Sequence, residues 1–167
     1  MKLSSRRAYD GHLVKLDVDE VIEPGGVRAT REVVRHPGSV AALPVEDDGS
    51  LILVRQYRYA IGEALWELPA GKLDGGEAPE DGMQRELREE IGRRATRLEP
   101  IARFFTTPGF CDEVMHLFRA TGLVADQAKA DEDERIEIGT FTLSEAEAMV
   151  ASGALREGKT LVAVLLE

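Results

Sequence analysis

Three glutamates, Glu86, Glu89 and Glu90, crowd the end of segment 79–91. This segment carries the clearest helix signal in the sequence, with a proline at its start and a glycine just beyond its end. Glu86 and Glu90 are four residues apart, so at about 100° per residue they share one side of the helix. The helix dipole disfavours anions there, and like charges at this spacing repel one another. Carboxylate oxygens on a rigid helix are nevertheless what Mg²⁺ or Mn²⁺ requires, so the pattern indicates a divalent-metal site.

A second interpretation is a solvated acidic face with Arg85 and Arg88 as charge partners, which is the usual meaning of an acidic helix. The spacing of the surrounding residues favours the metal site. The residues at fixed spacing are Gly71, Glu77, Arg85-Glu86-Leu87, Glu89-Glu90 and Gly92.

This pattern resembles the signature of the Nudix hydrolases. The signature is a loop, helix and loop that bind divalent metal and hydrolyse a nucleoside diphosphate linked to another group. Residues 71–93 would form this box, and eight specified positions match it, which makes the signal a strong one. The last box position is usually aliphatic and is Arg93 here, a departure that affects local packing more than chemistry.

Further segments resemble the ADP-ribose pyrophosphatase branch of that family. They are 31–38, 53–58 and 66–72. Pro108, fifteen residues beyond Arg93, matches the downstream proline by which the branch is identified. The resemblance covers residues from about 31 to 166 and implies the Nudix fold, a mixed β-sheet sandwiched between α-helices. Hydrolases of other nucleotide sugars share similar segments.

The resemblance also implies roles for box residues. Glu86 and Glu90 would ligate the metal together with the backbone carbonyl of Ala70, and Glu89 would assist them. Arg85 resembles the arginine that orients neighbouring box carboxylates, a task that a planar guanidinium suits better than an ammonium.

Outside these catalytic residues, Arg58 resembles an arginine that contacts the substrate's phosphates, although an exposed strand arginine is the alternative. Arg31 and Glu32 resemble residues near the adenine or a dimer contact. Pro108, like Arg58, Arg31 and Glu32, is expected to bind substrate. Glu77 is expected to be structural.

Hydrolysis of a diphosphate needs an activated water and neutralised phosphate charge, both of which metal ions supply. A base is also needed, and in the ADP-ribose pyrophosphatase branch it comes from a mobile acidic loop beyond the box. Residues 131–134 are four consecutive acids in the corresponding place. Glu134 is our first choice of base and Glu132 the second, although such a run is most often a solvated loop.

The elements that must position these residues are mostly strands in the first third of the chain. Val14, Leu16 and Val18 alternate with polar residues, the period of a half-buried strand. Segments 39–45 and 51–54 flank an acidic turn in a hairpin pattern. The expected strands are 12–22, 27–35, 39–45, 51–54, 64–68, 101–106 and 114–120.

Two helices are expected beyond the box. One has Ser144 as N-cap, Glu147 completing a capping box and Gly153 at its end. The other is the apolar segment 159–166, whose valines also permit a strand. Interleaved strands and helices predict an α/β (α+β) protein. We expect an N-terminal antiparallel β region at 1–36, for dimerisation and substrate contacts, and a Nudix hydrolase domain at 37–167.

The composition narrows the function further. The chain has 167 residues and a net charge of -10, which suits one domain and repels nucleic acid and acidic membranes. A single cysteine excludes an internal disulfide and predicts a reducing, cytoplasmic setting. No apolar run approaches the length of a membrane span.

The expected activity is Mg²⁺-dependent (or Mn²⁺-dependent) hydrolysis of ADP-ribose to AMP and ribose 5-phosphate by a homodimer. Two alternatives stay open: the same chemistry on another nucleoside diphosphate sugar such as GDP-mannose, and a Nudix module that senses a nucleotide without cleaving it. Hydrolysis of nucleoside triphosphates ranks below these.

Overall fold

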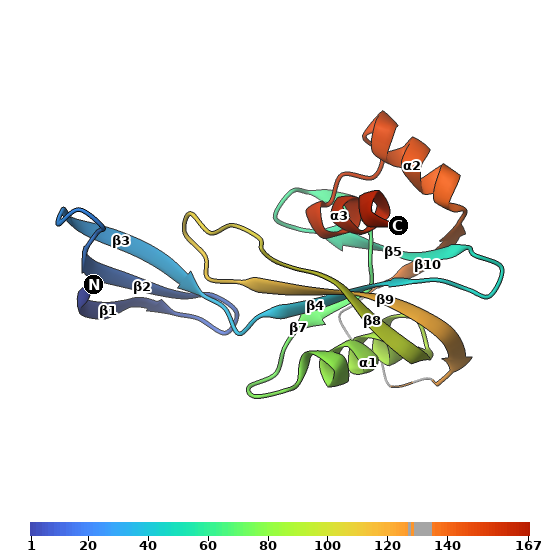
Figure 1. Cartoon of the computed structure of the whole chain (residues 1–167), viewed down its shortest axis with the longest axis horizontal. Coiled ribbons are helices and arrows are strands. Elements are labelled where there is room, and N and C mark those ends of the chain that lie inside the picture. The colour runs from blue at the N-terminus through green and yellow to red at the C-terminus, as the bar shows by residue number, and fades with distance from the viewer. Residues whose placement is uncertain (127, 129–134) are drawn as a thin grey trace. The chain divides into compact units, whose positions relative to one another are not determined.

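The computed structural model describes residues 1–126, 128 and 135–167. It comprises two compact units, one formed by Met1–Gly38 with Phe104–Met115 and the other by Ser39–Arg103 with His116–Glu167. The elements of the described chain, labelled in Figure 1, are β1 (Lys2–Asp10), β2 (Lys15–Ile22), β3 (Arg28–Arg35), β4 (Ser39–Pro44), β5 (Leu51–Arg58), β6 (Glu63–Glu67), β7 (Ala70–Lys72), α1 (Pro79–Glu90), β8 (Arg93–Phe105), β9 (Val114–Ala125), β10 (Glu137–Phe141), α2 (Leu143–Ser152) and α3 (Gly158–Leu166).

The first unit is built on an antiparallel sheet of β1, β2 and β3. The period of two expected in β2 is confirmed, but the buried side is the acidic one: Asp17 is 9% and Asp19 5% exposed, whereas Leu16 and Val18 on the other side are only partly buried. The reason is Arg35, whose Nε donates to Asp17 at 3.0 Å and whose Nη2 donates to Asp19 at 2.6 Å. A row that is partly apolar therefore stays accessible on the other side of β2.

Strand β1 was not predicted, because it has no apolar alternation and all nine of its residues are exposed. Pairing with β2 holds it, together with polar contacts in which Ser5 meets Asp19 and Arg7 meets Asp17. These cross-strand contacts have no signature in a local sequence window.

The second unit contains the sheets β10-β5-β6 and β7-β4-β9-β8. All six residues of β4 are buried, because α1 packs on β4 and β7 while α3 also packs on β4. Figure 1 shows α1 and α3 on opposite sides of this strand. The mixed α/β architecture, with sheet between helices, is therefore confirmed.

Helix α1 forms as predicted. Pro79 occupies the first turn, and Gly92 beyond the helix has a φ of 65°, which favours glycine. Met83 and Leu87 are fully buried and Ile91 is 7% exposed, all within one apolar cluster beneath the sheet. This row fixes the rotation of α1 about its axis and thereby fixes where its glutamates lie.

Two local predictions were wrong. The N-cap of α2 is Thr142, whose Oγ1 accepts from the Glu145 amide at 3.2 Å, while the Glu145 carboxylate accepts from the Thr142 amide at 2.7 Å. The Ser144 and Glu147 box was therefore placed two residues late. The hairpin pattern holds only at the turn, where the bridge Val45↔Leu51 and a 2.8 Å hydrogen bond from the Glu46 amide to the Ser50 carbonyl join the two arms. Beyond the turn, β4 and β5 belong to different sheets.

The ambiguous segment 159–166 is helical. The Glu157 carboxylate accepts hydrogen bonds from the amides of Lys159 and Thr160 and so caps the start of α3. Within the described ranges, each helix is too short or too polar to cross a bilayer.

Candidate functional site

Arg85 is the centre of a hydrogen-bonded group on α1. Its guanidinium donates to Glu77 at 3.1 and 3.2 Å, to Glu86 Oε1 at 2.6 Å and to Glu89 Oε2 at 3.1 Å. A further hydrogen bond, 3.1 Å long, goes to the carbonyl of Lys72. One cation thus orients three carboxylates and also binds the last residue of β7.

The charges in this group shift one another's titration. Hydrogen bonds to Glu77, and then the charge of Glu86, raise the pKa of Arg85 against the opposing effect of burial. The hydrogen bond from Arg85 correspondingly lowers the pKa of Glu77. Both groups therefore stay charged at neutral pH. Glu77 binds Nε and Nη2 of Arg85, whereas Glu86 binds Nη1.

Glu86 and Glu90 lie against β7. Both are only 8% exposed, and the Ala70 amide donates to Glu90 Oε2 at 3.1 Å. A Cβ built on Gly71 would lie 1.8 Å from Glu86 Oε1 and 2.0 Å from its Cδ. The glycine that opens the box is therefore needed for space, since the Glu86 carboxylate occupies the volume of its missing side chain.

This donor set fits a divalent cation. Two buried carboxylates with hard oxygens approach one short strand at consecutive residues, Ala70 and Gly71. Within the part of the chain that the structure describes, three or more His, Cys, Asp or Glu side chains do not gather around one point. Backbone oxygen, water or substrate oxygen would have to complete the coordination, as is usual for Mg²⁺.

Arg58 ends β5 and is held by a carboxylate that sequence reasoning missed. Its Nε and Nη2 each donate at 2.8 Å to one oxygen of Glu67, which is 1% exposed. Lys159 Nζ donates to Glu67 Oε2 at 2.7 Å. Glu67 and Lys159 are 92 residues apart, and the sequence around Glu67 reads as an ordinary strand, so no local signal pointed to this contact.

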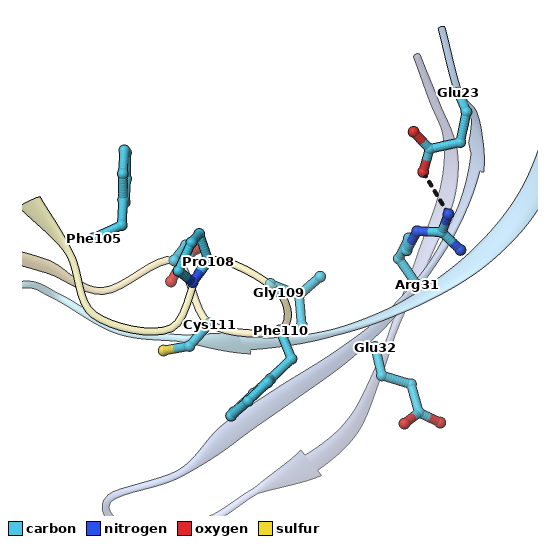
Figure 2. A pocket seen from close by; sticks show the side chains of 10 residues that line it. Glu23, Arg31, Glu32, Phe105, Pro108, Gly109, Phe110 and Cys111 are labelled. Carbon is cyan, nitrogen blue, oxygen red and sulfur yellow. Dashed lines mark ion pairs between the residues drawn. The ribbon is translucent and has the colours of Figure 1, made fainter. Parts of the chain in front are cut away.

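Arg31, Glu32 and Pro108 come together in the first unit, where they line one pocket of about 390 Å³ (Figure 2). Arg31 pairs with Glu23 at 2.9 Å, the contact dashed in the figure. Phe105 and Phe110 are both more than half exposed and supply apolar wall that sequence reasoning did not name.

The loop that carries Pro108 is anchored to β3. The Asp112 amide donates to the Val34 carbonyl at 3.2 Å, and Arg35 Nη1 donates to Asp112 Oδ2 at 3.1 Å. The pocket is therefore formed by a fixed loop and a strand. The phenylalanines on both sides of the Pro108-Gly109 pair, Phe105 and Phe110, were the sequence signal that could have indicated it.

The two predicted bases, Glu132 and Glu134, lie outside the described residues. The structure thus gathers the box residues and Arg58 within the second unit, and Arg31, Glu32 and Pro108 within the first.

Comparison with known proteins identifies the family. A family model described as NUDIX domain matches residues 35–162. The chain is 40% identical over 164 residues to the ADP-ribose pyrophosphatase of Bacillus subtilis (strain 168), covering 97% of this chain and 89% of the relative. It is 39% identical over 166 residues to the ADP-ribose pyrophosphatase of Mycobacterium tuberculosis (strain ATCC 25618 / H37Rv), covering 98% and 80%.

Two other proteins extend the comparison. A methanol dehydrogenase activator of Bacillus methanolicus is 38% identical over 164 residues, covering 97% of this chain and 89% of the relative. A crystal structure of an ADP compounds hydrolase superposes with a TM-score of 0.88 over 99% of this chain and 90% of the other, at 23% identity, a likeness of fold. Since the family model spans most of the sequence and relatives at about 40% identity cover nearly all of it, the chain belongs to the Nudix family.

Proposed function

We propose that this chain hydrolyses the pyrophosphate bond of ADP-ribose and releases AMP and ribose 5-phosphate. The observation that carries the proposal is the placement of Glu86 and Glu90, which are buried on α1 against β7 with a glycine beneath one carboxylate. The two ADP-ribose pyrophosphatases, at 40% and 39% identity, support the choice of substrate.

Nudix hydrolases generally use divalent metal ions, and Mg²⁺ is the ion we propose, with Mn²⁺ as the alternative. Glu86, Glu90 and the carbonyl of Ala70 would hold it, and when bound it supplies an activated water and neutralises phosphate charge. Arg85 keeps the Glu86 and Glu89 carboxylates oriented.

Other residues bind substrate or move protons. Arg58 contacts the diphosphate through its guanidinium, and Glu134, or failing that Glu132, takes the proton from the attacking water. These base assignments rest on the resemblance to the family alone.

The first unit would bind the adenine end or form a dimer contact through Arg31, Glu32 and Pro108. A homodimer is supported by accessible apolar side chains, namely Val14 just before β2, which is 42% exposed, and the partly buried Leu16 and Val18 on β2. We place the enzyme in the cytoplasm, in keeping with its single cysteine. Its net charge of -10 disfavours nucleic acid and anionic membranes as partners.

The direct test is turnover of ADP-ribose with Mg²⁺, with AMP and ribose 5-phosphate identified by chromatography. EDTA should abolish the reaction, and a Glu90→Gln preparation purified in parallel should show whether a contaminating hydrolase contributes. Values of kcat/KM are then compared across ADP-ribose, GDP-mannose and other nucleoside diphosphate sugars.

Each alternative has its own result. A higher kcat/KM for GDP-mannose or another sugar nucleotide would overturn the substrate while keeping the chemistry. Metal-independent binding of ADP-ribose without turnover would instead support a sensing module.

A further inference from the structure

Glu67 is unusual because its carboxylate is almost completely buried. Its side chain is 2% exposed, and it is shared between the Arg58 guanidinium and the Lys159 ammonium. Burial alone would raise the pKa of Glu67, but the hydrogen bond from Arg58 and the charge of Lys159 outweigh it and lower the pKa below its ordinary value. Buried ion pairs contribute little to stability on balance because desolvating the charges is costly. Stability therefore does not explain why a carboxylate occupies this position.

The geometry gives Glu67 a directional effect. It binds two nitrogens of Arg58 with its two oxygens, and because a guanidinium is planar this bidentate contact fixes the orientation of the whole group. The Arg58 side chain remains 41% exposed although its partner is buried. An arginine anchored in this way presents its guanidinium to the surface in one orientation.

The same short segment reaches the box. Glu67 is three residues before Ala70, whose amide binds Glu90 on α1. Between them, the Leu68 amide donates to Thr160 Oγ1 at 2.9 Å. Side chains of α3 and α1 thus hold residues 67–70 in place by hydrogen bonds. This segment therefore sets the separation between Arg58 and the box carboxylates.

Building on the proposed function, we infer that Glu67, steadied by Lys159, is a positioning residue that orients Arg58 toward the diphosphate of the nucleotide sugar. Glu67 itself does not touch the substrate. Lys159 contributes a second anchor, which links α3 to the orientation of Arg58.

The test is a double-mutant cycle of Glu67→Gln and Arg58→Ala, measured as kcat/KM for ADP-ribose with Mg²⁺. Arg58→Ala should lower kcat/KM by roughly ten- to a hundredfold, the range for a hydrogen bond to a charged group. Glu67→Gln should lower it by about tenfold, since an amide keeps one acceptor and loses the bidentate contact. If Glu67 acts through Arg58, the two losses do not add, and Glu67→Gln in the Arg58→Ala background costs no more than about twofold.

A second readout is the affinity for α,β-methylene ADP-ribose by calorimetry, which isolates binding from chemistry. Glu67→Gln should weaken it only when Arg58 is present. Glu167→Gln is the matched control, because it disturbs another arginine–carboxylate contact outside the Glu67 group, in which Arg119 Nε donates to both Glu167 oxygens at 2.9 and 3.0 Å. Its kcat/KM should match that of the unmodified enzyme.

The inference would be overturned if Glu67→Gln lowered kcat/KM by the same factor with and without Arg58→Ala, since Glu67 would then be structural. An unchanged kcat/KM in Arg58→Ala alone would overturn it as well. Both results leave ADP-ribose turnover by the unmodified protein intact, whereas absence of that turnover refutes the proposed function itself. Should Glu67→Gln fail to fold, Glu67→Gln/Lys159→Met, which removes one buried cation with the anion, completes the cycle in both backgrounds.

Discussion

Replacing Gly71 with alanine tests the close approach of strand β7 to helix α1. The φ of Gly71 lies outside the left-handed region, so alanine imposes no backbone penalty, and the only cost is space. The new Cβ would lie 1.8 Å from Oε1 and 2.5 Å from Oε2 of Glu86. The three nearest atoms to the new Cβ all belong to Glu86, so the substitution acts first on this carboxylate.

The displacement can be worked from these distances. Ordinary contact begins at 3.4 Å, so the Glu86 carboxylate has to retreat by roughly 1.6 Å or the strand has to move away from the helix. A misplacement of about 1 Å in a catalytic group can cost about a hundredfold in rate. Overpacking at such a site costs about 1–3 kcal/mol, which for a chain of this size lowers Tm by roughly 2–12 °C.

We therefore expect Gly71→Ala to lower kcat for ADP-ribose by a hundredfold or more while the protein stays folded. The assay is steady-state kinetics over a range of Mg²⁺ concentrations, with thermal unfolding by circular dichroism. Gly75→Ala is the matched control, since nothing lies within 4 Å of a Cβ there. Wild-type kcat and wild-type dependence on Mg²⁺ in Gly71→Ala would refute the view that Glu86 must occupy this position.

Three other perturbations separate chemistry from folding. Glu90→Gln should lower kcat by orders of magnitude and change Tm by only a few degrees, because it removes a charged ligand and keeps the side-chain shape; an unfolded variant would make Glu90 structural. Chelation with EDTA should abolish turnover and leave Tm within a few degrees, because Arg85 already compensates its neighbouring acids; a large fall in Tm would show that the helix needs the ion to fold. The pKa of Glu77 lies below its ordinary value of 4.5 through its hydrogen bond with Arg85, so its stabilisation is complete above that pH and is lost as the pH falls through the folded-state value. Glu77→Gln should therefore flatten the decline in unfolding free energy between about pH 5 and pH 3, and equal slopes in urea titrations would contradict this.

Much of the fold could be predicted because the decisive signals are local. The row of Met83 and Leu87 required a helix with one buried side, and the proline and glycine at its ends set its limits. Strand β1 and the buried side of β2 could not be predicted in this way. Their stability comes from charged pairs between strands, and hydrophobic periodicity assigns such acids to the surface.

The same distinction between local signals and long-range contacts applies to the functional site. The box residues follow one another on a single helix, so their spacing carried the information about their geometry. Glu67 and Lys159 could not be found, because they meet only after α3 packs on β4 and each looks ordinary in its own segment. Arg58 was identified from resemblance, but its anchoring depends on a contact that only the structure shows.

An acidic helix end is poor evidence for a metal site when taken alone. Arg85 pairs with Glu86 and Glu89, as expected of a charged surface, whereas Arg88 turns away and pairs with Asp126 at 3.3 Å. What distinguishes this helix from a solvated face is the close approach of Glu86 to Gly71. A solvated carboxylate avoids burial because losing water is costly, and it requires no glycine beneath it. A carboxylate that is mostly buried and fills the place of a missing Cβ is held there by the fold at some cost in stability, which is the usual condition of a residue kept for function.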